Sequence, residues 1–200
     1  MAMAQGINIS RQEPMSPELK EKSRKFLLWI GLVSIAMMFA GLTSGYIVRR
    51  QTGTWMKFDL PFTFWISTAI IIMSSITMNW CVQLIRKNSL KMLTTAVLTT
   101  LLLGIGFGVF QFISWYVLIS KNIYFTGTES SASASYLYIL CALHLCHILG
   151  GLIALSVIYF KSLRRKYSAD NHLGIKLCAT YWHFLDGLWV YLFIFMLIMR

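Results

Sequence analysis

The stretch CATYWHFLDGLWVYLFIFMLIM, residues 178–199, decides the fold of this 200-residue chain. A helix needs about 20 apolar residues to cross the hydrocarbon core of a bilayer. The apolar residues of this stretch are continuous, whereas a transmembrane barrel strand would show alternation. Two ionisable residues, His183 and Asp186, stand inside it. The stretch therefore predicts a membrane helix that carries a histidine and an aspartate.

Four further runs of the same kind precede this one. Hydrophobic residues make up 57% of the chain and charged residues only 12%, which is far from the composition of a soluble domain. The sequence predicts an all-α polytopic membrane protein, with a polar tail at 1–25 and a single five-helix transmembrane domain at 26–200. Its spans are expected at about 26–48, 62–85, 92–119, 136–160 and 177–199.

The positive charges lie mostly on one side of these spans. Of 18 Lys and Arg residues, thirteen fall in the N-terminal tail and in the loops 86–91 and 161–176, and five fall on the other side. By the positive-inside rule, the N-terminus is expected in the cytoplasm and the C-terminus in the periplasm. The net charge of +11 then reflects membrane orientation and anionic lipid headgroups, and we expect no nucleic acid as a partner.

The loops between the predicted spans are short, so no soluble domain is expected on either side of the membrane. The chain contains no GxxxxGK, GxGxxG or CxxCH motif for a nucleotide or a covalently bound haem. The function is therefore expected inside the bilayer or in contacts with neighbouring membrane proteins.

Paired glycines mark faces where helices can approach closely. Gly41 and Gly45 are four residues apart, as are Gly104 and Gly108, so each pair lies on one helix face. These faces suit packing within the bundle or the docking of another subunit.

The segment LHLCHILGGL places His144 and His147 three residues apart on one helix, followed by Gly150 and Gly151. Such a pair can ligate a metal or haem, relay protons, or form hydrogen bonds to neighbouring helices and lipid. A haem between helices would need a histidine opposite, and the other spans offer only His183.

Asp186 is the only carboxylate within the five predicted spans, and it is expected near the middle of the bilayer. Burial of an aspartate there costs at least about 2.5 kcal/mol, so its side chain should face protein, water or a partner. His183 lies one turn earlier on the same face, where an intrahelical ion pair or hydrogen bond with Asp186 is natural.

These motifs together resemble subunit III of the haem-copper respiratory oxidases, in the short five-helix bacterial form. YWHFLDGLW is similar to the signature of that family's last helix, and four further segments resemble family motifs in the same order. The segments are HLGIKL with His172, LHLCHILGG with His144 and His147, GIGFGVFQFISW with Gln111, and SIAMMFAGLTSGY in the first span.

Three carboxylates that are usual in the family are absent from this chain. Ile35, Ser114 and Lys176 stand at the matching positions. Roles that depend on those acids are therefore not carried over.

The resemblance implies a subunit without catalytic residues, haem or metal of its own. Such a subunit packs on the catalytic subunit I of an aa3-type cytochrome c oxidase, with subunit II nearby, in the inner membrane of a bacterium. It binds phospholipid in a cleft between helices 1–2 and helices 3–5 and sustains proton-coupled electron transfer to oxygen in aerobic respiration. Haem a and copper are expected in the partner subunits. Polar, lipid or interhelix contacts are implied for His144, His147, His183, Asp186, Gln111, His172, Trp182 and Trp189.

Other functions stay open from the sequence alone. An accessory membrane subunit of nitric-oxide reductase systems resembles the same family and has a similar five-helix size, so it is one alternative. A small haem-binding cytochrome that uses His144, His147 and His183 is a second alternative, and a small transporter is a third. The sequence does not decide between cytochrome c and quinol as the electron donor, nor whether the oxidase joins a quinol-oxidising complex in a supercomplex.

Overall fold

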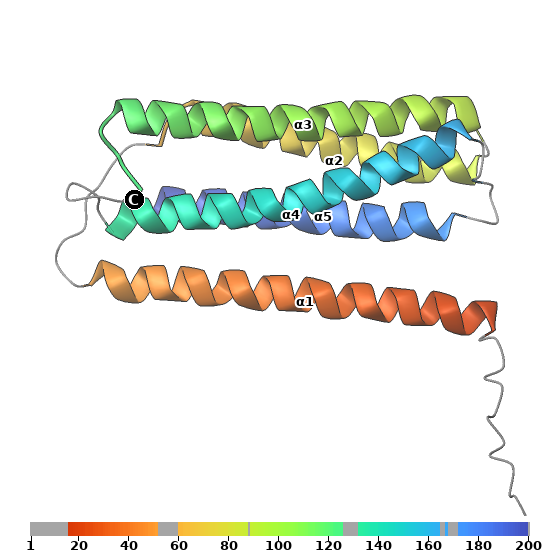
Figure 1. Ribbon diagram of the computed structural model, residues 1–200, viewed down its shortest axis with the longest axis horizontal. Coiled ribbons are helices and arrows are strands. Elements are labelled where there is room, and N and C mark those ends of the chain that lie inside the picture. Colours follow the sequence, from red (N-terminus) through yellow and green to blue (C-terminus); the bar gives the residue numbers. More distant parts are fainter. Residues whose placement is uncertain are drawn as a thin grey trace, which may run out of the picture.

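The computed structural model describes residues 16–51, 60–87, 89–125, 132–164, 167 and 172–199. The described residues form five α-helices that lie side by side along one axis (Figure 1). Each helix is long and apolar enough to cross a membrane, which confirms the predicted all-α fold with five candidate spans. The helices are α1 (Pro17–Arg50), α2 (Thr63–Arg86), α3 (Leu90–Ser120), α4 (Ala132–Leu163) and α5 (Leu173–Met199).

The first helix begins within the segment that the sequence assigns to the polar tail. Ser16 caps α1 and accepts a hydrogen bond from the backbone N–H of Leu19 at 3.4 Å, and Pro17 occupies the first turn. Glu21 and Lys25 then form an ion pair at 2.6 Å on the exposed helix surface. Capping and an i, i+4 pair start the helix before the apolar run, which hydropathy alone does not detect.

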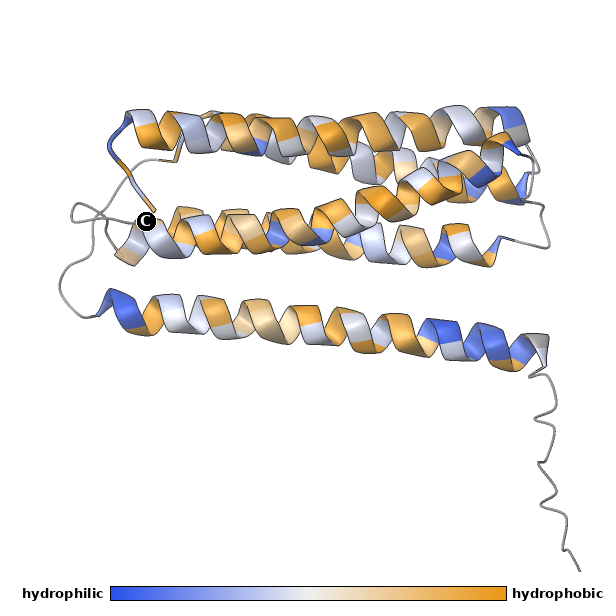
Figure 2. Cartoon of the chain, in the orientation of Figure 1, coloured by the Kyte–Doolittle hydropathy of each residue, from blue (hydrophilic) through white to orange (hydrophobic). Residues whose placement is uncertain are grey.

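Hydrophobic residues cover the middle of the bundle, and hydrophilic residues gather towards its ends (Figure 2). The start of α1, the end of α2, the start of α3, the end of α4 and the start of α5 lie at one end of the bundle (Figure 1). Most of the Lys and Arg residues that the structure describes lie at these helix ends. The described basic residues thus concentrate at one end of the bundle, and the side of the membrane that this end faces stays a prediction.

The helices α4 and α5 have the most neighbours, three each. The contact between α2 and α3 is the most extensive, α5 packs on α1, α2 and α4, and α4 packs on α1, α3 and α5. Within the described residues, α1 contacts α4 and α5 but neither α2 nor α3. A hydrogen bond of 3.1 Å between the hydroxyls of Thr43 and Tyr191 helps to hold α1 on α5.

This packing does not show the predicted cleft between helices 1–2 and helices 3–5. The second helix packs along α3 and α5, so it does not form a unit with α1. Because α1 and α2 share only α5 as a neighbour, a groove remains between α1, α2 and α5.

Candidate functional site

The two tryptophans of the α5 signature are fully buried and hydrogen-bonded to α2. The indole N–H of Trp182 donates to the hydroxyl of Ser74, and the indole N–H of Trp189 donates to the hydroxyl of Thr68, each at 3.0 Å. An indole N–H buried in an apolar region needs such a partner. Both tryptophans therefore connect α5 to α2.

The intrahelical pair expected between His183 and Asp186 does not form. The Nδ1 atom of His183 lies 2.7 Å from the hydroxyl of Ser75 on α2. Asp186 is only 5% exposed, and its two carboxyl oxygens have no hydrogen-bond partner among the described residues. The partner of His183 is thus a hydroxyl group of the neighbouring helix α2, and not the carboxyl group one turn away on its own helix.

Ser74, Ser75 and Thr68 were not singled out in the sequence analysis. A sequence signal for them exists, because Ser67 and Thr68 recur as Ser74 and Ser75 seven residues later. Seven residues are two helical turns, so both pairs lie on one face of α2. Serine and threonine at this spacing indicate a face that can form hydrogen bonds to another membrane helix.

The ring of Trp182 also packs against two glycines from other helices. A Cβ atom added at Gly104 of α3 would come within 2.7 Å of the Trp182 ring, and one added at Gly151 of α4 would come within 2.9 Å. No real Cβ atom is accommodated at such distances without a shift of its neighbours. Trp182 thus fills a space formed by α3 and α4 while it donates a hydrogen bond to α2.

The other glycines of the sequence analysis have looser surroundings. A Cβ at Gly45 would lie 3.4 Å from the hydroxyl of Tyr136, one at Gly150 would lie 3.6 Å from that of Tyr181, and one at Gly108 would lie 3.8 Å from Leu145. Nothing described lies within 4 Å of such an atom at Gly41. A side chain at the Gly41 position would therefore find open space among the described residues.

His144 is fully buried among aromatic rings. The centroid of its ring lies 5.2 Å from the ring centroid of Trp189, 5.9 Å from that of Phe107 and 6.4 Å from that of Phe39. Neither ring nitrogen of His144 has a hydrogen-bond partner among the described residues. The imidazole is therefore packed as an apolar ring would be packed.

His147 takes a different role although it is only three residues away. Its Nδ1 atom lies 2.7 Å from the carbonyl oxygen of Leu143, and its own carbonyl accepts a hydrogen bond of 3.0 Å from the hydroxyl of Tyr181. Across the described part of the chain, no three His, Cys, Asp or Glu side chains come together as metal ligands. The structure thus does not gather His144, His147 and His183 into one ligand set.

Gln111 and Ser114 link α3 to α2. The Gln111 amide donates to the hydroxyl of Ser67 at 3.2 Å, and the Ser114 hydroxyl donates to that of Thr63 at 2.6 Å. Ser114 occupies a position that is usually a glutamate in the resembled family. In this chain, the position makes a neutral hydrogen bond between two helices.

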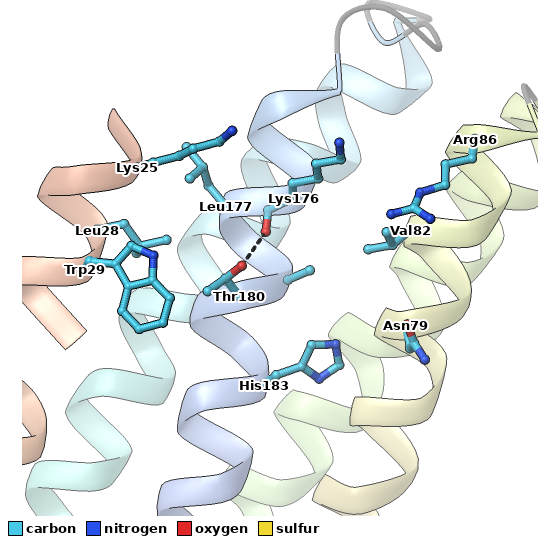
Figure 3. Close-up of a pocket in the computed structure, with 11 residues that line it drawn as sticks. Lys25, Leu28, Trp29, Asn79, Val82, Arg86, Lys176, Leu177, Thr180 and His183 are labelled. Atoms are coloured by element: carbon cyan, nitrogen blue, oxygen red, sulfur yellow. Dashed lines mark hydrogen bonds between the residues drawn. The ribbon is translucent and has the colours of Figure 1, made fainter. Parts of the chain in front are cut away.

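A groove of about 390 Å³ opens between α1, α2 and α5 at the basic end of the bundle (Figure 3). Three cationic side chains from three helices line it: Lys25 of α1, Arg86 of α2 and Lys176 of α5. His183 and Asn79 line the groove farther along the bundle (Figure 3). Its remaining lining residues are Leu28, Trp29, Val82, Leu177, Ala179 and Thr180.

His172 lies at the beginning of α5, near the same end. Its Nδ1 atom is buried and has no hydrogen-bond partner among the described residues. The backbone carbonyl of His172 accepts bonds from the N–H groups of Ile175 and Lys176 in the first turn of α5. His172 therefore takes part in the start of the helix that carries the signature.

The chain is similar to proteins of known families over most of its length. Residues 54–199 match the family model described as "Cytochrome c oxidase subunit III". A "Probable cytochrome c oxidase subunit 3" of Nocardia farcinica is 30% identical over 177 residues, which cover 84% of this chain and 82% of that protein.

Longer relatives match over part of their length. A "Probable cytochrome c oxidase subunit 3" of Rickettsia felis is 35% identical over 168 residues, which cover 79% of this chain and 57% of that protein. A "Cytochrome c oxidase subunit 3" of Rhipicephalus sanguineus is 31% identical over 142 residues, or 70% of this chain and 51% of that protein. The chain thus spans little more than half the length of these two relatives.

Proposed function

Because this chain belongs to the cytochrome c oxidase subunit III family, we propose that it is the cofactor-free third subunit of an aa3-type cytochrome c oxidase in a bacterial inner membrane. In this role, it packs on the catalytic subunit I, with subunit II nearby. Those subunits hold the haem a and copper, and this chain sustains their proton-coupled transfer of electrons to oxygen.

The observation that carries this proposal is the use of the family signature in helix packing. Trp182, His183 and Trp189 each make a hydrogen bond to a serine or threonine hydroxyl of α2. Polar side chains inside a membrane bundle stabilise helix association by such bonds. The signature thus supports a structural subunit whose contribution is a well-defined surface for its neighbours.

Affinity purification of this chain from membranes tests the proposal. We expect a large subunit with haem a and a copper site to copurify, together with a copper-containing second subunit. A nonhaem-iron large subunit would instead identify the nitric-oxide reductase alternative. The same purification, analysed by mass spectrometry, shows whether a quinol-oxidising complex is attached.

We further propose that the groove between α1, α2 and α5 binds the headgroup of an anionic phospholipid. Lys25, Arg86 and Lys176 supply positive charge at the end of the bundle that is expected to face the cytoplasm. Glu21 pairs with Lys25, so the four side chains keep a net positive charge. Leu28 and Trp29 offer apolar surface on the α1 side of the same groove.

Replacement of all three groove cations by glutamine tests this lipid site. Each cation near an anionic headgroup contributes to its binding, so we expect the anionic phospholipid that remains with the purified complex to fall by about tenfold. The matched control replaces Lys87 and Lys91, which lie outside the groove at the same end of the bundle. Equal lipid loss in the control would show that the groove is not the site.

A further inference from the structure

Two rows of polar side chains face each other across the groove. On α2, Arg86, Asn79 and Ser75 follow one another at intervals of seven and four residues, which keeps them on one helix face. Arg86 and Asn79 line the groove, and Ser75 bonds to the histidine at its inner end. Insertion of polar residues into a membrane helix costs free energy, so a row of this length suggests a function for these side chains.

The facing row lies on α5 and ends at the aspartate. Lys176, Thr180 and His183 line the groove at intervals of four and three residues, and Asp186 follows after three more. Exposure falls along this row, from the exposed Lys176 and Thr180 through the half-buried His183 to Asp186 at 5%. The row therefore leads from the bundle end towards the middle of the 27-residue helix α5.

The inner end of the two rows is joined by a short hydrogen bond. Nδ1 of His183 and the hydroxyl of Ser75 are 2.7 Å apart. Asp186 lies four residues after Trp182 and three before Trp189, on the helix face whose two tryptophans donate hydrogen bonds to Ser74 and Thr68 of α2. The Ser75 hydroxyl also interacts with the carboxyl group of Asp186, one turn further along α5.

Neither carboxyl oxygen of Asp186 forms a hydrogen bond of standard geometry with the described residues, although the Ser75 hydroxyl lies close to the carboxyl group. Burial of a carboxyl group in a membrane helix has a high free-energy cost, so this position needs an explanation. The groove is large enough for several water molecules, and it ends at the imidazole of His183. An imidazole can accept a proton at one nitrogen while it releases one from the other.

We propose that Asp186 is a proton-exchange site that communicates with the groove through Ser75 and His183. In the release direction, the Asp186 carboxyl gives its proton to the Ser75 oxygen, and the Ser75 proton moves to Nδ1 of His183. Nε2 of His183 then gives its proton to water in the groove. One proton leaves the protein, Asp186 remains as a carboxylate, and the serine and the imidazole stay neutral. Uptake is the reverse.

The charged and titratable groups around this route come from all the helices that pack on α5. They are Lys25 and Glu21 of α1, Arg86 of α2, His144 and His147 of α4, and Lys176, His172 and Tyr181 of α5 itself. Of these groups, Lys25, Arg86 and Lys176 line the groove. The route is independent of the proposed lipid, because it requires only water at the inner end of the groove.

Infrared spectroscopy of the purified native complex tests the inference. We expect a carbonyl band of a protonated carboxyl group that is missing in Asp186→Asn and that shifts when water is replaced by D₂O. The shift should be slower by about tenfold in Ser75→Ala and in His183→Phe, which is the rate change that corresponds to roughly one lost hydrogen bond.

Ser74→Ala is the matched control. It also removes one bond between α2 and α5, at the neighbouring residue, but leaves the link from Ser75 to His183 intact. Its exchange rate should equal that of the unchanged protein. The inference is overturned if Asp186→Asn removes no band, if the band does not shift in D₂O, or if Ser75→Ala exchanges as fast as Ser74→Ala.

The lipid proposal and the proton-exchange proposal are tested by different measurements, so one can be wrong without the other. The glutamine variant of Lys25, Arg86 and Lys176 should lose lipid but keep the infrared band of Asp186. If that variant keeps its lipid while Ser75→Ala slows exchange, only the lipid proposal is wrong.

Discussion

The indole ring of Trp182 occupies the space that a side chain at Gly104 would need. A Cβ atom at Gly104 would lie 2.7 Å from the ring and 2.8 Å from a methyl group of Leu152. The ring cannot easily move away, because its N–H is bonded to Ser74 and the neighbouring atoms of the same ring meet Gly151. Three helices are thus positioned around one side chain of α5.

Gly104→Ala should therefore destabilise the bundle. Overpacking of a well-filled core costs about 1 to 3 kcal/mol, so we expect a lower midpoint in thermal unfolding of the purified complex. Gly106→Ala is the control, because nothing described lies within 4 Å of a Cβ at that position. Equal midpoints for the two variants would contradict the packing described for Trp182.

Thr68→Val should weaken the contact between α2 and α5. Valine keeps the shape of threonine but leaves the indole N–H of Trp189 without its acceptor. A single hydrogen bond between membrane helices contributes about 0.6 kcal/mol on average, so a small decrease in the free energy of unfolding is expected. Thr99→Val serves as the comparison, since among the described residues the Thr99 hydroxyl bonds only to a carbonyl of its own helix, that of Thr95.

His144→Leu should leave the bundle equally stable or make it more stable. The imidazole nitrogens are buried and have no partner among the described residues, and removal of an unsatisfied buried polar group relieves its desolvation cost of about 1 to 3 kcal/mol. Thermal unfolding of the complex measures the effect. A clear loss of stability would show that His144 binds a group outside the described chain.

Asp186→Ala should lower the retention of this subunit in the oxidase more than it lowers initial turnover. The carboxyl lies between two hydrogen-bonded contacts of α5 with α2, so its removal leaves a cavity at that interface. The measurements are subunit stoichiometry after purification and oxygen consumption in the first turnovers. An intact complex with abolished initial turnover would assign Asp186 a direct part in the oxidase reaction.

The predicted orientation can be tested by cysteine labelling from each side of the membrane. A membrane-impermeant thiol reagent should modify Lys121→Cys, at the end of α3, from the periplasmic side. It should modify Lys87→Cys, at the end of α2, only after the membrane is permeabilised. Labelling in the reverse pattern would place the basic end of the bundle outside the cell.

The five spans could be predicted from the sequence because membrane insertion depends on a local property. A continuous apolar run of sufficient length identifies a spanning helix without reference to the rest of the chain. The start of α1 at Pro17 was missed because capping and the pair between Glu21 and Lys25 act outside the apolar run. The family motifs likewise could be read directly, because they are short and lie within single helices.

The partners of the signature residues were decided only by the tertiary structure. The sequence placed Asp186 one turn from His183, but Ser75 of another helix takes the bond to His183. The groove cations Lys25, Arg86 and Lys176 come from three helices that are distant in sequence. Such contacts depend on which helices are neighbours and on how each is rotated about its axis. That choice depends on the packing of all the side chains at once, and Trp182 between Gly104 and Gly151 shows how closely this packing fixes it.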